Sequence, residues 1–190
     1  KKEQASSEGP IDVNICALKG PTAIGMTKFM SDVDNGTIKD NNYNFSITAA
    51  VDEVAPGLVQ GTIDIAAVPA NLSSVIYNNT DGGVEVLAIN TLGMLYVVEN
   101  GDTVSSVEDL RGKTIYASGK GSTPEFALNY ILEANGIDPE NDVNIEWKSE
   151  HAECLAALTS DENGIAMLPQ PFVATAMNQD DSIRIAIDLN

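Results

Sequence analysis

The chain contains the motif Lys19-Gly20-Pro21-Thr22 and carries it again as Lys120-Gly121-Ser122-Thr123, at an offset of 101 residues. Further matches follow in the same order and at nearly the same offset. They pair Tyr43–Ile47 with Val143–Trp147, Ile65–Pro69 with Ile165–Pro169, and Leu87–Asn90 with Ile185–Asp188. Matches in one order at one spacing indicate an internal duplication, so we predict two related halves.

Each copy has the same predicted order of elements. A short apolar strand, Ile11–Leu18 or Thr114–Ala117, leads into the Lys-Gly turn. A helix follows, then an alternating strand, a second helix, and a buried strand that ends at Pro69 or Pro169. Strands that alternate with helices predict mostly parallel sheets covered by helices on both faces.

The first helix of each copy has its own sequence signal. In the first copy, apolar residues near helical spacing over 23–33 predict one continuous helix. In the second, Ser122-Thr-Pro-Glu125 has the form of a capping box with proline in the first turn, and Gly136 is expected to end the helix.

A continuous apolar stretch, Thr91–Val98, joins the two copies and is followed by the turn 99–102. This pattern suits a strand that crosses between two lobes as a hinge. The first ten residues are polar and lack periodicity. We therefore predict a flexible linker over 1–10, a first lobe over 11–97 and a second lobe over 98–190.

Composition excludes several classes of protein. The 190 residues include 43% hydrophobic ones, as in an ordinary globular protein, and the net charge of −18 makes nucleic acid an unlikely partner. No stretch has the length of a membrane span, and we expect no signal peptide within this sequence. We expect Cys16 and Cys154 to be buried free thiols. The single histidine leaves little room for a metal cluster or a triad, so we predict no metal, no cofactor and no catalytic residue.

Ligands of open parallel sheets bind beyond the carboxyl ends of the strands. This rule selects equivalent places in the two repeats. The candidate ligand-binding residues are Lys19, Gly20, Pro21, Thr22, Ala50, Pro69 and Asn71 in the first repeat, and Gly121, Ser122, Thr123, Gln170 and Pro171 in the second.

These candidates suit an anionic or polar small molecule. Gly20 and Gly121 allow a close backbone approach, and the helices that follow offer unpaired N–H groups. Serine or threonine before a helix often serves only as a cap, and that alternative stays equally open. The phosphate-loop and GxGxxG patterns are missing, which disfavours nucleotides.

Several segments resemble the solute-binding proteins of ABC importers, in particular the nitrate/sulfonate/taurine and thiamine-precursor branch. They are 11–22, 61–69, 107–115, 121–124 and 168–171. The resemblance implies an α/β fold of the type II periplasmic-binding-protein class, with two lobes that each hold a mostly parallel sheet flanked by helices. It also implies a small-molecule ligand captured by hinge closure, delivery to a membrane permease and an extracytoplasmic location. In Gram-positive members a lipid-modified cysteine tethers the polar N-terminus. We expect a monomer.

The sequence departs from this family in one respect. In the family, the chain crosses back after the second repeat and completes the first lobe, whereas this sequence stops at Asn190. We therefore expect the C-terminal return segment to be absent and the first lobe to expose apolar surface.

Two alternatives use the same fold. An enzyme of a thiamine-pyrimidine or menaquinone pathway would need a convergent acid–base or metal set, which scattered carboxylates and one histidine disfavour. An effector-binding domain of a transcription factor would need a DNA-binding segment, which residues 1–10 cannot supply.

Overall fold

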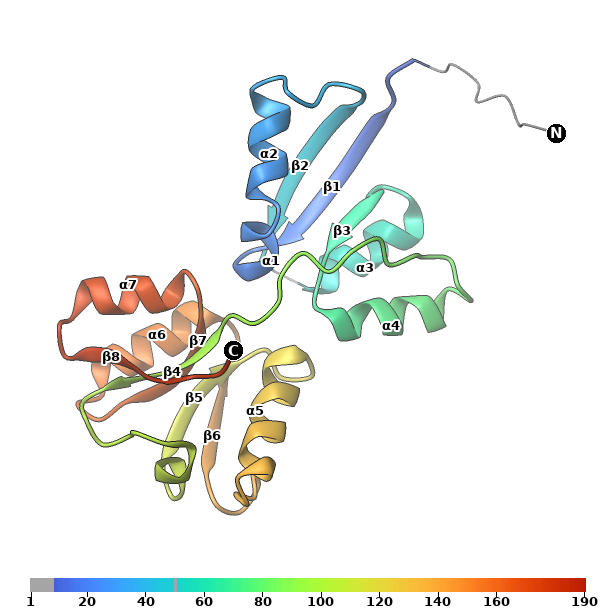
Figure 1. Cartoon of the computed structure of the whole chain (residues 1–190). Helices are drawn as coiled ribbons and strands as arrows, with labels where there is room; N and C mark the ends of the chain where they lie inside the picture. The colour runs from blue at the N-terminus through green and yellow to red at the C-terminus, as the bar shows by residue number, and fades with distance from the viewer. Residues whose placement is uncertain (1–8, 50) are drawn as a thin grey trace. The chain divides into compact units, whose positions relative to one another are not determined.

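The computed structural model describes residues 9–49 and 51–190, which form two compact units (Figure 1). The first unit holds the described residues up to Val68 together with Ser73–Asn90, and the second holds Pro69–Leu72 and Thr91–Asn190. Most of the expected linker, residues 1–8, lies outside the described residues.

The first unit is built on a three-stranded parallel sheet of order β2-β1-β3. Its strands are β1 (Asp12–Leu18), β2 (Asn42–Thr48) and β3 (Ile65–Ala67). Its helices are α1 (Pro21–Ile24), α2 (Thr27–Asp34), α3 (Val51–Gln60) and α4 (Ala70–Asn79), the first turn of α4 being grouped with the second unit. Side chains of β1 alternate between two apolar clusters. Ile15 packs with Phe29 and Met30 of α2, whereas Cys16 packs with Val54 of α3, so helices cover both faces as predicted.

The helix expected over 23–33 is divided into two. The Gly25 N–H bonds to the Pro21 carbonyl in helical fashion, but the Met26 N–H bonds to the Ala23 carbonyl, one residue short of the α pattern. Glycine is a poor helix former, and Met26 is buried with Ala23 in the apolar cluster beside β1. The prediction of one continuous helix is therefore wrong at Gly25 and Met26.

The second unit is built on a five-stranded sheet of order β6-β5-β7-β4-β8. Its strands are β4 (Leu95–Asn100), β5 (Thr114–Ser118), β6 (Asn144–Lys148), β7 (Ile165–Pro169) and β8 (Ile183–Asp188). Strands β5, β6 and β7 are parallel, and β4 runs antiparallel to both β7 and β8. Its helices are α5 (Thr123–Ala134), α6 (His151–Ser160) and α7 (Phe172–Gln179), with a short 3-10 helix over Val107–Leu110.

Two apolar clusters hold this sheet between its helices. On one face, Met167 of β7 packs with Leu128 and Leu132 of α5. On the other face, Leu168 of β7 packs with residues of α6 and α7, among them Leu158. Figure 1 shows α5 on one side of the sheet and α6 and α7 on the other. Cys16 and Cys154 are free and buried, as expected from the sequence.

The stretch that joins the repeats differs from the expectation. The contacts divide the chain between Asn90 and Thr91, not after residue 97, because β4 forms part of the second sheet through its pairing with β7 and β8. Thr91–Met94 precede the strand and have no regular structure.

The last pair of matching segments, 87–90 and 185–188, does not have the same structure in the two units. Ile185–Asp188 lie in β8, but Leu87–Asn90 form no strand. A strand needs a neighbour for its backbone groups, which β8 finds in β4, whereas no ladder within the described residues includes 87–90. Leu87 and Ile89 are 71% and 73% exposed, so the first unit exposes apolar side chains, as we expected.

Candidate functional site

The candidate residues that the structure describes lie in, or directly after, turns that follow parallel strands. In the first unit, β1 ends at Leu18, directly before the Lys19-Gly20 turn. The Lys19 N–H donates to the Thr48 carbonyl at the end of β2, with an N–O distance of 2.8 Å. This bond ties the turn to the neighbouring strand.

The Gly20 turn needs glycine, but the helix behind it is short. Gly20 has a φ of +111°, which side chains with a Cβ rarely adopt. Pro21 begins α1, which has only four residues. The Thr22 hydroxyl donates to the Leu18 carbonyl at 2.5 Å, so its proton is engaged within the chain.

The remaining candidates of the first repeat have different surroundings. Ala50 lies outside the described residues. Pro69 and Asn71 follow β3 and are grouped with the second unit. There the Asn71 Nδ2 donates to the Gly121 carbonyl at 3.2 Å, which brings two predicted site residues together.

The turn after β5 is shaped by two glycines, Gly119 and Gly121, with φ of +82° and +77°. Ser122 is the N-cap of α5, but within the described residues its side chain makes no capping bond. Glu125 instead accepts from the Gly121 N–H at 2.5 Å. The expected capping box is therefore wrong. The carboxylate reaches one residue further back, and the Ser122 hydroxyl is left for other partners.

The turn after β7 contains Gln170 and Pro171, which is the N-cap of α7. The Gln170 Oε1 accepts from the Ala174 N–H at 3.3 Å, so its carbonyl oxygen caps the helix and its amide nitrogen is directed elsewhere. The peptide bond between Gln170 and Pro171 is cis.

The structure adds a pair of residues that were not among the site candidates. Ser118, the last residue of β5, is only 2% exposed, and its Oγ lies 2.7 Å from Nδ1 of His151, the first residue of α6. The Phe172 ring lies beside the imidazole, with 5.3 Å between ring centroids. The sequence held a usable signal, because both residues stand at strand ends. The rule on strand ends takes in both residues, within 118–123 and 148–151, although the sequence singles out neither as a ligand-binding residue.

Burial sets the protonation of this pair and its neighbour. It lowers the pKa of His151 to about 4, so the imidazole is neutral at physiological pH. Burial also raises the pKa of the Cys154 thiol to about 11, so the thiol stays protonated. Lys148, at the end of β6, pairs with Glu146 at 3.0 Å and lies 5.2 Å from the centre of the Tyr116 ring. Its pKa is raised mainly by that bond to Glu146.

Within residues 9–49 and 51–190, no group of three or more His, Cys, Asp or Glu side chains could hold a metal ion. None of the helices in that part of the chain is long and apolar enough to cross a membrane.

A family model described as the phosphonate periplasmic substrate-binding protein of ABC transporters matches residues 28–187. The match spans most of the chain, and the chain belongs to this family. No curated protein matches the sequence.

Solved structures agree with the fold. An ABC transporter protein from Parabacteroides distasonis is 26% identical, with a TM-score of 0.72 over 94% of this chain and 59% of its own. The aliphatic sulphonate binding protein from Escherichia coli is 16% identical, with a TM-score of 0.66 over 95% of this chain and 61% of its own. The nitrate-binding protein from Synechocystis PCC 6803 is 15% identical, with a TM-score of 0.64 over 88% and 49%.

These likenesses confirm the expected periplasmic-binding-protein fold. The chain spans about 60% of the length of the first two of these structures.

Proposed function

We propose that this chain is the solute-binding component of an ABC importer and captures a small polar or anionic molecule. The observation that carries the proposal is the family match over 28–187, which includes every strand and helix that borders the candidate turns except β1 and α1. The partners that follow from this role are the small molecule and the membrane permease. An extracytoplasmic location, a lipid anchor and a monomeric state are part of the same proposal.

The ligand-binding groups lie in the turns after the parallel strands of each unit. In the second unit, the Ser122 hydroxyl has no capping role among the described residues, and Thr123 and Gly121 stand beside it at the start of α5. In the first unit, Lys19 supplies the cation nearest to the Gly20 turn. Gln170 keeps its amide N–H₂ group for a ligand, because its oxygen caps α7. These donors suit acceptor oxygens on the ligand.

An enzymatic role has one feature in its favour and more against it. The contact between Ser118 and His151 resembles a nucleophile with its base. A base with a pKa of about 4 is, however, poorly matched to proton abstraction from serine at neutral pH. Ser118 is also 98% shielded from solvent, so no substrate carbon could approach its oxygen. We therefore propose binding without catalysis.

The test is calorimetry and thermal shift across alkanesulfonates, nitrate, phosphonates, amino acids and pyrimidine precursors. We expect at least one class to bind saturably, and Ser122→Ala to weaken it. Ser160→Ala is the matched control, because its hydroxyl bonds the Ala156 carbonyl at the far end of α6. No binding by any class, or equal loss in both variants, contradicts the proposal.

A further inference from the structure

Four asparagines of the chain are followed directly by glycine, namely Asn35, Asn100, Asn135 and Asn163. An asparagine loses its side-chain ammonia when the next backbone nitrogen attacks its Cγ and closes a five-membered succinimide ring. Glycine in the next position favours this reaction, because it has no Cβ to obstruct the approach and its backbone adopts many conformations. The four dipeptides are identical, so their surroundings in the fold decide which of them reacts.

The side chain of Asn35 is activated by its own turn. Asn35 follows the last residue of α2, and it is exposed together with Gly36 and Thr37. Its Oδ1 accepts from the Thr37 N–H at 3.0 Å and from the Thr37 hydroxyl at 2.5 Å. Two donors on this oxygen stabilise the negative charge that develops on it when Cγ is attacked. No partner among the described residues holds the Nδ2 of Asn35, so its leaving group is free.

The attacking nitrogen belongs to Gly36. Its N–H donates to the Val33 carbonyl at 3.0 Å, in the last turn of α2. Helix ends fray, so this bond opens more readily than the bonds in the middle of a helix. Because Gly36 is exposed, water or hydroxide reaches the freed N–H and removes its proton.

Asn100 is the opposite case, because it is only 8% exposed and its carboxamide is held at both ends. Its Nδ2 donates to the Asp161 carbonyl at 2.9 Å, and its Oδ1 accepts from the Ser182 hydroxyl at 2.6 Å. The Gly101 N–H donates to the Ser182 carbonyl at 3.3 Å. Attack on this Cγ would require the whole network to open, so we expect Asn100 to be protected.

Asn135 is the closest comparison, because it also follows the last residue of a helix, α5. Its Nδ2 donates to the Ile131 carbonyl at 2.8 Å, which ties the carboxamide to the preceding turn of the helix. The residue two positions further on is Ile137, which has no hydroxyl and whose N–H donates to the Leu132 carbonyl at 2.9 Å. This site therefore lacks the free leaving group and the activated carbonyl found at the end of α2.

Asn163 is exposed, but the glycine after it is immobilised. Gly164 is buried, its N–H donates to the Asp161 carbonyl at 3.0 Å, and its carbonyl accepts from the Asn100 N–H at 2.9 Å. A Cβ built on Gly164 would lie 2.8 Å from the Leu158 carbonyl oxygen, so this backbone is closely packed. The nucleophile cannot turn toward Cγ of Asn163 without breaking these contacts.

We propose that Asn35 is a site of spontaneous deamidation and that the Thr37 hydroxyl accelerates it. The Gly36 nitrogen loses its proton to water or hydroxide and forms a bond to Cγ of Asn35. The bond from Cγ to Nδ2 breaks, and the side-chain nitrogen leaves as ammonia. Water then opens the succinimide at either of its two carbonyls and yields aspartate or isoaspartate. No oxidant, reductant or cofactor takes part.

The reaction changes the end of α2. Its product adds a negative charge directly after the helix, where Asp32 and Asp34 already lie. A negative charge at this end of a helix is unfavourable because of the helix dipole. Isoaspartate also adds a methylene to the backbone and so disturbs the turn that Thr37 closes. Nothing in this reaction depends on the proposed binding function.

Peptide mapping by mass spectrometry follows all four sites in one sample of the full chain kept at pH 8 and 37 °C for days. Enzymatic methylation of isoaspartate identifies the product. We expect deamidation at Asn35 to be about tenfold faster than at each of the other three sites. Thr37→Val should slow it about fivefold, the effect of one lost hydrogen bond on a rate, and Thr37→Ser should restore it. Thr27→Val is the matched control and should leave the rate unchanged, because its hydroxyl bonds the Ile24 carbonyl at the start of α2.

The same chain unfolded in urea separates the effect of structure from that of sequence. There we expect the four sites to react at similar rates and Thr37→Val to react like the unaltered chain. If Asn35 keeps its lead in urea, the fold does not cause it and the proposal is overturned. Faster deamidation at Asn135 or Asn163 than at Asn35 in the native protein overturns the assignment of the site. An unchanged rate in native Thr37→Val overturns the role of the hydroxyl.

Discussion

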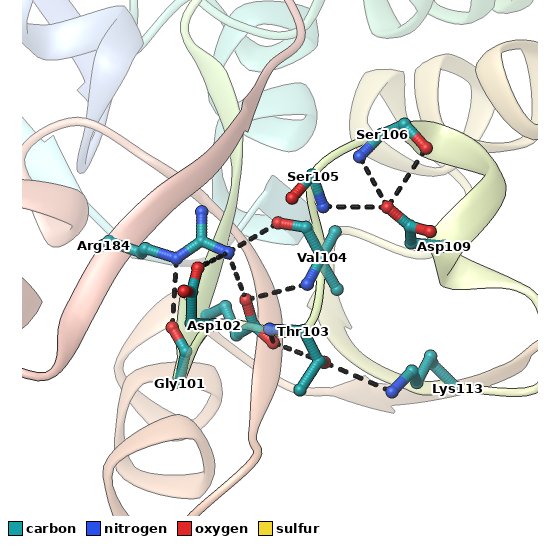
Figure 2. Close-up of polar contacts among 10 residues, drawn as sticks. Gly101, Asp102, Thr103, Val104, Ser105, Ser106, Asp109, Lys113 and Arg184 are labelled. Atoms are coloured by element: carbon teal, nitrogen blue, oxygen red, sulfur yellow. Dashed lines mark hydrogen bonds and ion pairs between the residues drawn. The ribbon is translucent and has the colours of Figure 1, made fainter.

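Arg184 of β8 donates from Nη2 to Oε2 of Glu99 in β4 at 2.8 Å, and Glu99 is completely buried (Figure 2). A buried carboxylate is costly unless its oxygens are fully paired. Here the Thr103 N–H and hydroxyl donate to Oε1 at 2.8 and 2.6 Å, and the Val104 N–H donates to Oε2 at 3.1 Å. Glu99 thus anchors the chain that leaves β4.

The Arg184 side chain completes this network. It donates to the carbonyls of Gly101 and Val104 at 3.0 and 2.6 Å and pairs with Asp102 at 3.0 Å. Burial by itself raises the pKa of Glu99, but the bonds from Thr103 and Val104 and the charge of Arg184 outweigh it, so the pKa is lowered. The carboxylate is therefore ionised, and it fixes the register between β4 and β8.

The variant Arg184→Met removes the cation and leaves the buried carboxylate with fewer partners. We expect a loss of about 3 kcal/mol in the free energy of unfolding of the second unit, because breaking a buried pair leaves an uncompensated charge. Urea titration followed by fluorescence of Trp147, the only tryptophan, reports on this unit. Arg111→Met is the control. Its partner Asp142 and Arg111 itself are partly exposed, so we expect a loss below about 1 kcal/mol. Equal losses contradict the anchoring role of Glu99.

A second prediction concerns the end of α5, where Gly136 has a φ of +71°. The Gly136 N–H bonds to the Glu133 carbonyl and the Ile137 N–H to the Leu132 carbonyl, a Schellman motif that satisfies the last carbonyls of the helix. Gly136→Ala places a Cβ in this left-handed conformation and should cost roughly 1 kcal/mol by urea titration. Gly136→Asn is the matched comparison and should lose less, because asparagine tolerates this region better. A smaller loss for alanine than for asparagine contradicts the backbone explanation.

The internal repeat predicted the parallel strands in the core of each unit because those strands, and the turns and helices after them, depend on residues close together in the sequence. An apolar strand, a glycine turn and the start of a helix can be recognised within about 20 residues, and both β1 and β5 lie where their sequences place them. The end of α5 before Gly136 can be predicted from the sequence for the same reason. Positive φ favours glycine regardless of the rest of the fold.

Features that depend on distant partners were not predictable in this way. Leu87–Asn90 and Ile185–Asp188 are similar in sequence, yet only the second lies in a strand, because β4 pairs with it. The contact between Ser118 and His151 also joins residues from different strand–helix connections. Both the strand at 185–188 and the contact between Ser118 and His151 depend on the order of strands in the sheet. The sequence of a single segment does not determine that order.

A third prediction concerns the thiols. Cys154 is fully buried and Cys16 is 4% exposed, and burial raises the pKa of Cys154 to about 11. Thiolate is the reactive form, so we expect the native protein to react slowly with an aromatic disulfide reagent at pH 8 and to release two equivalents in urea. Cys154→Ala should remove one equivalent in urea without changing the native rate. Fast reaction of Cys154 in the native protein contradicts its burial in the apolar cluster with Leu158 and Val173.

The last prediction is the pH dependence of stability that His151 imposes. Its pKa falls from 6.5 in the unfolded chain to about 4 in the folded protein because of burial. Between these values the unfolded chain binds a proton that the folded protein does not. Acidification therefore favours unfolding. We expect the second unit to lose stability as pH falls from 6.5 to 4, by an amount on the order of 3 kcal/mol, and no further loss from this group below pH 4.

The variant His151→Gln isolates this contribution, because an amide does not titrate but can still accept from the Ser118 hydroxyl. Urea titrations at pH 7, 6, 5 and 4, followed by Trp147 fluorescence, give the difference between the two proteins at each pH. Contributions from groups that titrate alike in both proteins cancel in this difference. A difference that stays constant from pH 7 to pH 4 means that His151 titrates as it does in the unfolded chain. Such a result contradicts the buried neutral imidazole on which its contact with Ser118 depends.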